Sequence, residues 1–217
     1  MSFKTKKYQV IRGTLSKELA NFIFNYMLLQ RQAVEYLLKH NKISQTNPFI
    51  GVRNDDQVSD CYSKYGDWVT ETLLEFVRPV MKAKTGMDLI PTYSYTRLYE
   101  KGNILHRHKD RGSCEVSTTI HLGGEEWPIY LDPTGDTSVI DDKKHIVKPG
   151  ASQGIRIDLK VGDMLMYSGC ELEHWREPFQ GTVCSQVFLH YNNSEGSFAR
   201  RNVYDKRPLL GVPQERK

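Results

Sequence analysis

The chain has 217 residues, enough for one substantial domain, and its 39% hydrophobic and 26% charged residues are ordinary for a globular protein. A formal net charge of +4 permits a nucleic-acid or acidic partner without requiring one, and four cysteines without CxxC spacing argue against a zinc knuckle. No apolar run approaches the length of a membrane span, and the lysine-rich start precedes no apolar segment, so we expect a cytoplasmic protein without a signal peptide.

The start of the chain predicts a short strand and a long amphipathic helix. Residues 8–11 have the composition of a strand, and Ser16 is placed to cap a helix over residues 17–40. Apolar residues recur along that helix at helical spacing, which predicts one buried face. Its expected members are Leu19, Phe22, Ile23, Tyr26, Met27, Val34 and Leu37.

A second helix is predicted after a polar loop over residues 41–56. It covers residues 58–84, is kinked or divided at Pro79, and is closed by Gly86. The apolar residues of this segment again predict a face that packs on the rest of the molecule. Its expected core residues are Trp68, Val69, Leu73, Leu74, Phe76 and Val77.

From residue 89 onward the pattern changes to short strands separated by turns, which is typical of a closed or rolled-up β architecture. The strands are predicted over residues 91–99, 114–122, 127–131, 155–159, 164–167, 171–176 and 186–191. Residues 132–152 are polar and predict a surface insertion. The basic tail over residues 197–217 predicts an arm rather than part of the core.

A His-x-Asp motif in the β region carries the candidate chemistry. His108 and Asp110 are two residues apart, and alternate side chains of an extended chain point the same way, so both can reach one metal ion. His174 lies far along the chain and can supply a third ligand. Two neutral imidazoles and a carboxylate leave three coordination positions open, the facial triad typical of non-haem iron(II) oxygenases. His106 shares the parity of His108, so an all-histidine cupin site of His106, His108 and His174 stays open.

Two further features surround these residues. Tyr99 and Gly102, spaced Tyr-x-x-Gly, precede the motif, and residues 161–167 lead toward the distal histidine. In order and spacing, residues 89–191 resemble the 2-oxoglutarate- and iron(II)-dependent oxygenase superfamily, nearest its prolyl-hydroxylase-like branch. The resemblance implies a mainly β fold, with a double-stranded β-helix, or jelly roll, over residues 89–196 as the catalytic core.

The resemblance also implies a role for the other segments. Residues 1–88 would form an N-terminal strand and a layer of two or more α-helices packed on the core, and residues 197–217 a basic C-terminal arm, all within a single structural domain. The family places its carboxylate ligand two positions after the first histidine. It therefore selects His108, Asp110 and His174 as the iron ligands and the catalytic centre.

In the family, 2-oxoglutarate chelates the iron through its keto oxygen and one carboxylate, and a basic residue about ten positions after the second histidine meets its other carboxylate. The sequence departs from that pattern, because residues 181–186 contain no Lys or Arg. Arg176 is the expected replacement, since it follows the second histidine by two residues and its guanidinium matches a carboxylate. Arg97 is the second choice, and His121 and Tyr99 are further expected contacts of 2-oxoglutarate.

The implied activity is that of a 2-oxoglutarate-dependent dioxygenase, a hydroxylase that acts on a C–H bond and releases succinate and CO2. Fe(II) and the cosubstrate 2-oxoglutarate are the implied cofactors, with O2 as co-reactant and ascorbate as a candidate reductant. The absence of a cation over residues 181–186 keeps a cupin-like metal enzyme that does not use 2-oxoglutarate as one alternative. A non-catalytic jelly-roll binding module is another.

The substrate and the oligomeric state do not follow from the sequence. A protein side chain such as proline, an amino acid, a small metabolite or a nucleobase is reachable, because loops set the specificity of such a scaffold. Specificity is expected in the loop over residues 41–56, the insertion over residues 132–152 and the basic tail. That tail and Arg107, Lys109 and Arg111 could bind an anionic substrate, but a solvated charged rim is the favoured interpretation.

Overall fold

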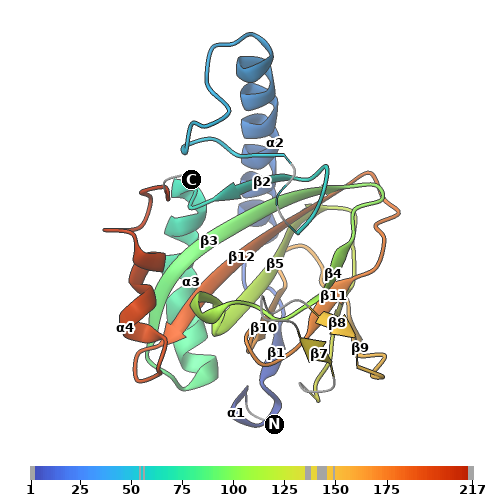
Figure 1. Ribbon diagram of the computed structural model, residues 1–217, viewed down its shortest axis with the longest axis vertical. Helices are drawn as coiled ribbons and strands as arrows, with labels where there is room; N and C mark the ends of the chain where they lie inside the picture. The colour runs from blue at the N-terminus through green and yellow to red at the C-terminus, as the bar shows by residue number, and fades with distance from the viewer. Residues whose placement is uncertain are drawn as a thin grey trace.

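The computed structural model of the protein describes residues 3–53, 55, 57–134, 138–140, 146–148 and 150–214. Its strands form two main antiparallel sheets whose inner faces share a core (Figure 1). The larger sheet has the order β1 (Tyr8–Ile11), β10 (Met164–Tyr167), β5 (Val116–Gly124), β12 (Val183–Asn193), β3 (Leu89–Glu100) and β2 (Tyr62–Tyr65). The smaller has the order β4 (Leu105–His108), β11 (His174–Arg176), β6 (Ile129–Leu131) and β9 (Ile155–Ile157).

Successive strands alternate between the two sheets from β3 to β6 and again from β9 to β12. This alternation brings segments that are far apart in sequence side by side, as β4 and β11 are in the smaller sheet. The prediction of a mainly β architecture is therefore confirmed.

Helices α2 (Lys17–Lys39) and α3 (Trp68–Thr85) cover the outer face of the larger sheet (Figure 1). α2 begins after Ser16, whose hydroxyl accepts a backbone N–H of the first turn at 3.2 Å, as predicted. The Asp67 carboxylate caps α3 in the same way at 2.9 Å. α3 ends at Gly86, which adopts a φ of +68° and closes the helix as predicted.

The second helix is shorter than the predicted range of residues 58–84. Residues 62–65 instead form the edge strand β2, which pairs with β3. Gly66 then turns the chain at a φ of +61°, and only after Asp67 does the helix begin. Pro79 lies inside α3 without ending it, because apolar residues on both sides of it pack on the sheet.

Three aromatic residues expected in the core lie in solvent. Phe22, Trp68 and Phe76 are 66%, 67% and 63% exposed, so the helices carry more apolar surface than one sheet face covers. The residues of α2 that are fully buried are Ala20, Ile23, Met27 and Val34. None of the helices in the described part of the chain combines the length and apolarity that a membrane crossing needs.

Short elements complete the fold. They are α1 (Phe3–Lys6), the 3-10 helix η1 (Gly112–Cys114), α4 (Ala199–Asn202), the 3-10 helix η2 (Val203–Lys206), and the hairpin of β7 (Val139–Ile140) and β8 (Ile146–Lys148). The hairpin belongs to the predicted insertion, of which residues 135–137, 141–145 and 149 lie outside the described residues. Residues 54 and 56 of the predicted loop and residues 215–217 of the tail also lie outside them.

The C-terminal segment packs on the body of the molecule, so the prediction of an arm over residues 197–217 is wrong for its described part. Arg207 is buried, and its Nη2 donates to Glu71 Oε1 at 2.5 Å and to the Thr92 carbonyl at 3.1 Å. Asp205 is buried beside it. Buried ion pairs and hydrogen bonds therefore bind this basic segment to α3 and β3.

Alternation along the long strands divides their side chains between the two faces of the larger sheet. On β3, Tyr95 and Tyr99 point toward the smaller sheet, whereas Leu98 packs beneath α2. On β12, Phe188 points inward and Val187 packs beneath the helices. The inner face thus offers aromatic and polar side chains to a space enclosed by both sheets.

Candidate metal centre and adjoining pocket

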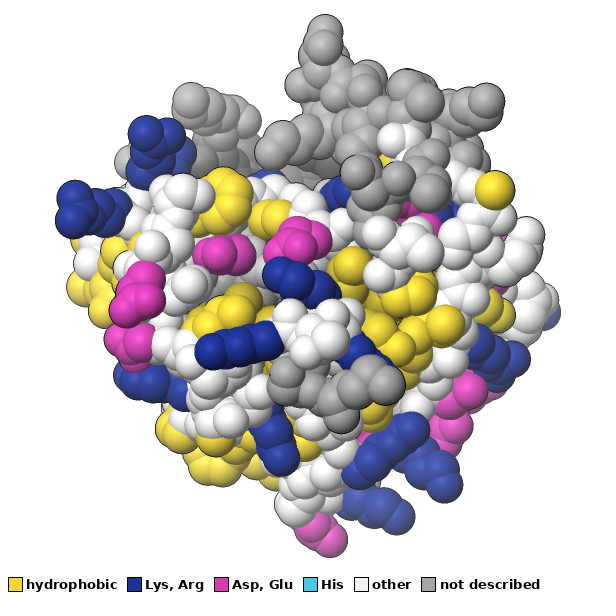
Figure 2. Space-filling view, turned by 90° about the horizontal axis from the view of Figure 1, so that it is seen from below, with side chains coloured by type: hydrophobic (Ala, Val, Ile, Leu, Met, Phe, Trp, Pro, Cys, Tyr) yellow, Lys and Arg dark blue, Asp and Glu magenta, His cyan; other side chains and the backbone are white. Residues whose placement is uncertain are grey.

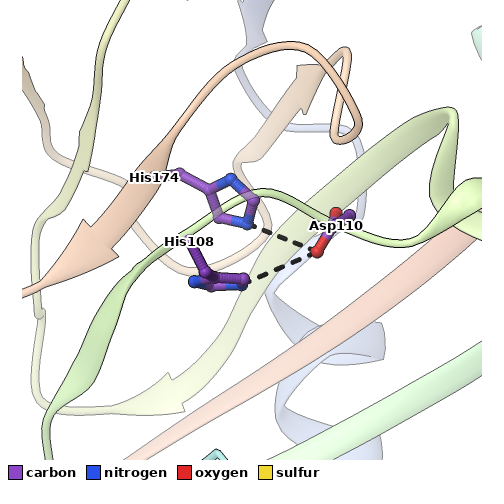
Figure 3. Close-up of side chains that lie close together, drawn as sticks. All are labelled: His108, Asp110 and His174. Atoms are coloured by element: carbon purple, nitrogen blue, oxygen red, sulfur yellow. Dashed lines mark ion pairs between the residues drawn. The ribbon is translucent and has the colours of Figure 1, made fainter. Parts of the chain in front are cut away.

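His108, Asp110 and His174 meet between neighbouring strands of the smaller sheet and the loop that follows β4 (Figure 3). His108 ends β4 and His174 begins β11, and the two are direct partners in the antiparallel ladder. Asp110 Oδ1 lies 3.6 Å from His108 Nε2 and 3.5 Å from His174 Nε2. Three ligand atoms this close together can hold one metal ion. The structure therefore brings together the triad that the motif predicted.

Hydrogen bonds orient both imidazoles toward the carboxylate. His108 Nδ1 lies 2.7 Å from the His106 carbonyl, and His174 Nδ1 lies 3.0 Å from the Leu172 carbonyl. A carbonyl can only accept, so each Nδ1 carries the proton and each Nε2 presents its lone pair toward Asp110, as metal ligation requires. The His106 side chain is exposed and joins no cluster of three metal-ligating groups among the described residues, so the all-histidine cupin arrangement is not formed.

The second carboxylate oxygen of Asp110 accepts a hydrogen bond from the larger sheet. Ser117 Oγ on β5 donates to Asp110 Oδ2 at 2.9 Å and lies 2.9 Å from His190 Nδ1 on β12. The hydrogen bond fixes Oδ2 and leaves Oδ1 facing the imidazoles. His190, for which the sequence predicted no partner, therefore supports the site. Asp110, Cys114 and His190 form a second cluster of potential ligands, but it shares Asp110 with the first.

The electrostatics of the cluster suit a cation. Burial raises the pKa of Asp110, but the adjacent His174 and His108 outweigh it and hold that pKa well below its ordinary value. Burial and the neighbouring His174 lower the pKa of His108, which favours the neutral ring. A charged carboxylate beside a neutral imidazole is the donor chemistry that Fe(II) accepts.

A cavity of about 790 Å³ opens beside the cluster, within the usual size range of small-molecule sites. Much of its wall is aromatic or apolar, and is formed by Tyr65, Tyr93, Tyr95, Leu105, Ile129, Tyr167 and Phe188. Its charged members include Asp55, Arg97, Arg107, Lys109 and Arg111. The cavity wall therefore combines aromatic and apolar side chains with many polar and charged ones.

Arg176 is fully buried two residues beyond His174 on β11, with Trp175 between them turned outward. Its guanidinium lies 5.1 Å over the Trp127 ring, and donates to the Trp127 carbonyl and to Thr119 Oγ1 at 3.4 Å. Across the described residues no carboxylate pairs with Arg176, and its Nε has no hydrogen-bond partner. Burial lowers the pKa of Arg176. A buried cation without a counter-ion is costly, so Arg176 is a strong potential binding group for an anion.

A second buried donor lies close to that arginine. Gln186 Nε2 donates to His121 Nδ1 at 3.1 Å, so the ring proton of His121 lies on Nε2. Within the described part of the chain, this Nε2 has no hydrogen-bond partner. Burial and the charge of Arg176 lower the pKa of His121 to about 4, so the ring is neutral. His121 and Arg176 thus both carry buried donors that lack an acceptor.

Arg97 lies in the pocket wall but is already paired. Its Nε donates to Asp55 Oδ2 at 2.6 Å and its Nη2 to Gln57 Oε1 at 2.7 Å. Its Nη1 lies 3.4 Å from Tyr99 Oη, so the structure brings these two predicted contacts together. Burial raises the pKa of Tyr99 to about 12, which keeps its hydroxyl protonated.

The arginines near the triad are paired as well. Arg107 Nη2 lies 2.7 Å from Asp132 Oδ2, and Arg107 also pairs with Glu173, whose carboxylate is fully buried. Arg111 Nη2 lies 2.6 Å from Asp205 Oδ2. Carboxylates of the protein therefore already neutralise Arg107 and Arg111, although both line the cavity. On the face of the molecule in Figure 2, cationic and anionic side chains are likewise mixed.

One residue beside the candidate metal ligands was not predicted as part of the site. Tyr167 Oη lies 3.4 Å from His174 Nε2, and the two rings are 4.6 Å apart. Strand alternation could have indicated it, because Tyr167 lies two residues after Leu165 and therefore on the same face of the predicted strand. Leu165 lies in the core between the sheets.

No protein-family profile and no curated protein sequence matches the chain. Solved structures do match its fold. A prolyl-4-hydroxylase from Pseudomonas putida superposes with a TM-score of 0.60 at 11% identity, over 88% of this chain and 95% of that one. A prolyl hydroxylase from Trichoplax adhaerens, in complex with a hypoxia-inducible-factor peptide, superposes with a TM-score of 0.60 at 12% identity, over 92% and 88%.

The protein HygX from Streptomyces hygroscopicus, solved with nickel and 2-oxoglutarate bound, has a TM-score of 0.55 at 12% identity, over 89% of this chain and 85% of that one. The chain therefore has the fold of the 2-oxoglutarate- and iron(II)-dependent oxygenases, including prolyl hydroxylases. The resemblance predicted from the His-x-Asp motif is confirmed at the level of fold.

Proposed function

We propose that the protein is an Fe(II)- and 2-oxoglutarate-dependent oxygenase that hydroxylates a C–H bond of its substrate. One observation carries the proposal: His174, whose Nε2 faces Asp110, and Arg176, a buried cation without a counter-ion, lie two residues apart on one strand. A metal ligand and a carboxylate-binding group are thus side by side, as chelation of a keto acid requires. The fold supports the same conclusion.

The triad residues fit Fe(II). His108 and His174 would bind it through Nε2 and Asp110 through Oδ1, while the carbonyls that accept from each Nδ1 fix the planes of the rings. Ser117 holds the other carboxylate oxygen, which prevents Asp110 from turning away. When bound, iron and 2-oxoglutarate supply the oxidising chemistry, in which O2 is consumed and succinate and CO2 are released.

The unpaired donors fit the distal carboxylate of 2-oxoglutarate. Arg176 would supply the charge, and His121 Nε2 and the protonated Tyr99 hydroxyl would supply neutral hydrogen bonds. Complete burial of Arg176 and His121 excludes water, which strengthens each of these interactions. Arg97 is a weaker candidate, because Asp55 already neutralises it.

The architecture agrees with this assignment. We infer that residues 89–196 form a double-stranded β-helix, to whose larger sheet the N-terminal region adds the edge strands β1 and β2 and the helices that cover it. Ligands on β4 and β11 then converge because these strands are neighbours, although they lie far apart in the sequence.

The cavity beside the triad is proposed to admit the substrate, because Arg176 and His121, the proposed contacts of 2-oxoglutarate, are not among the residues that line it. Tyr65, Tyr93, Tyr95, Tyr167 and Phe188 line it, and Arg97, Arg107 and Arg111 are paired with carboxylates. This lining favours a neutral group, such as an amino-acid side chain within a protein or an uncharged part of a small metabolite, over an anion.

Turnover of 2-oxoglutarate tests the proposal. The protein is purified without oxygen, loaded with Fe(II), and given 2-oxoglutarate and O2, and succinate is quantified. We expect succinate to form with Fe(II) and not with Zn(II). Full iron occupancy without any 2-oxoglutarate consumption would instead favour a cupin-like enzyme, and failure to bind metal would favour a binding module.

A further inference from the structure

One face of α2 presents large apolar side chains to solvent. Phe22, Leu29 and Tyr36 are 66%, 65% and 62% exposed and are spaced seven residues apart. Seven residues are nearly two helical turns, so these side chains form one line along the helix, here called the α2 seam. The intervening Asn25 and Gln32 are exposed and uncharged, so no charge interrupts the seam.

The seam faces away from the sheet that α2 covers. The buried residues Ile23, Met27 and Val34 lie on the other side of the helix, and in Figure 1 the upper part of α2 extends past the sheets. Tyr36 lies with its ring 4.3 Å from the His40 ring, at the end of its own helix. Three large apolar side chains exposed in one line, with only uncharged residues between them, are typical of an interaction surface.

We propose that the α2 seam pairs with the same seam of a second copy of the chain, in antiparallel orientation, about a two-fold axis at Leu29. Phe22 and Tyr36 each lie seven residues from Leu29. An antiparallel pair therefore places Leu29 against the partner's Leu29, and Phe22 against the partner's Tyr36. Because the same patch serves both copies, the contact closes as a dimer and does not propagate.

Charge at the helix ends selects the antiparallel orientation. Glu18 lies eleven residues before Leu29 and Lys39 ten residues after it, and both are exposed. Antiparallel pairing brings Glu18 close to the partner's Lys39 at each end of the seam. Parallel pairing would instead place like charges together, which is unfavourable at both ends.

The size of the contact sets its expected strength. One helix pair falls near or below the roughly 1,200 Å² that stable interfaces bury, so we expect a dimer that dissociates on dilution. Its centre is the leucine pair, flanked on each side by two aromatic rings, a composition that suits the core of an interface. The seam lies on the outer face of the helical layer, so dimerisation is independent of the proposed oxygenase activity.

Disulfide trapping tests the pairing and its direction. In a Cys170→Ser background, which removes the partly exposed native cysteine, Leu29→Cys is expected to give a disulfide-linked dimer on mild oxidation. Tyr36→Cys alone is expected not to, because the two copies of residue 36 would lie about 20 Å apart along the axis. A mixture of Phe22→Cys and Tyr36→Cys proteins is expected to cross-link. The antiparallel arrangement would be overturned if Tyr36→Cys formed a disulfide with itself and the mixture gave no disulfide between residues 22 and 36.

Sedimentation analysis of the native chain tests the dimer itself. Between about 1 and 100 µM the native protein is expected to pass from monomer to dimer, and Leu29→Glu to raise the dissociation constant about thirtyfold or more. Leu209→Glu is the matched control, because Leu209 is 56% exposed but lies outside the seam, and it should change nothing. A native protein that stays monomeric, or a dimer unaffected by Leu29→Glu, would contradict the proposal.

Discussion

His174 and Arg176 enter the space between the sheets from the same face of β11, while Trp175 between them faces outward. A potential metal ligand and a buried, unpaired cation are thus separated by one residue. We propose that Arg176 takes the place of the Lys or Arg that residues 181–186 lack. The positive charge proposed to bind 2-oxoglutarate lies on the strand that carries the second histidine and not on the last strand, β12.

Arg176→Met should weaken 2-oxoglutarate binding and leave metal binding intact. Loss of the buried partner of a bound carboxylate costs about 2–5 kcal/mol, roughly thirtyfold to several thousandfold in affinity. Methionine keeps an apolar side chain of similar length against Trp127. The check is a titration of 2-oxoglutarate into the metal-loaded protein without oxygen, with metal content measured in parallel.

Arg97→Met is the matched control for that variant. Its effect on 2-oxoglutarate affinity should be much smaller, because Arg97 Nε already pairs with Asp55 Oδ2 at 2.6 Å. An unchanged affinity in the Arg176 variant would refute the role given to Arg176. A large loss in the Arg97 variant alone would transfer that role to Arg97.

The metal assignment predicts that His108→Ala and Asp110→Ala each lose Fe(II) and turnover of 2-oxoglutarate. His106→Ala should keep both, since its side chain is exposed and only its carbonyl contacts His108. Iron stoichiometry of the three purified proteins decides the matter. Near-native iron in the first two variants, or an empty site in the third, would be incompatible with the proposed triad.

Ser117→Ala should lower metal affinity without abolishing it. The variant removes the hydroxyl that fixes Asp110 Oδ2 at 2.9 Å, and loss of such a supporting contact typically costs about 10- to 100-fold in affinity. Ser185→Ala is the matched control, because its buried hydroxyl has no partner among the described residues. Competition with a metal chelator measures the metal affinity of each variant. Equal metal affinities in the two variants would show that Ser117 does not support the site.

Asp205 should make stability depend on pH. Burial raises the pKa of Asp205, but hydrogen bonds from Arg111, Ser113 and Tyr65 outweigh it and lower the pKa from 3.8 to about 2. The stabilisation, about 2 kcal/mol, is therefore fully present above the unfolded-state pKa and is lost as pH falls through the folded-state value.

Comparison with Asp205→Asn isolates this contribution. Urea unfolding should show the native protein more stable than the variant at pH 6, with the difference smaller by about 1 kcal/mol at pH 3. A difference that does not change with pH would mean that the charge of Asp205 does not stabilise the C-terminal segment.

The face of a strand on which a side chain lies could be predicted from the sequence. Strand parity alone placed His108, His174 and Arg176 on inward faces, because side chains alternate with a period of two whatever surrounds them. The alternation after residue 89 likewise predicted the β core. Both signals are local, so they survive without knowledge of the tertiary structure.

Features that depend on distant segments could not be predicted. The partners of Arg97 and Arg111 are Asp55 and Asp205, which lie 42 and 94 residues away in the sequence, so no local spacing indicates them. The helix predicted over residues 58–84 started too early for the same reason. Residues 62–65, near the start of that range, pair with β3 as an edge strand, and this pairing outweighs their helical pattern.

The most direct test of the central claim is an anaerobic absorption spectrum of the protein with Fe(II) and 2-oxoglutarate together. We predict a weak visible charge-transfer band of the chelated keto acid, which requires both the metal held by His108, Asp110 and His174 and its chelation by the keto oxygen and adjacent carboxylate of 2-oxoglutarate. The band should be absent with either component alone. Its absence at saturating concentrations of both, in protein with a full complement of iron, would contradict the account.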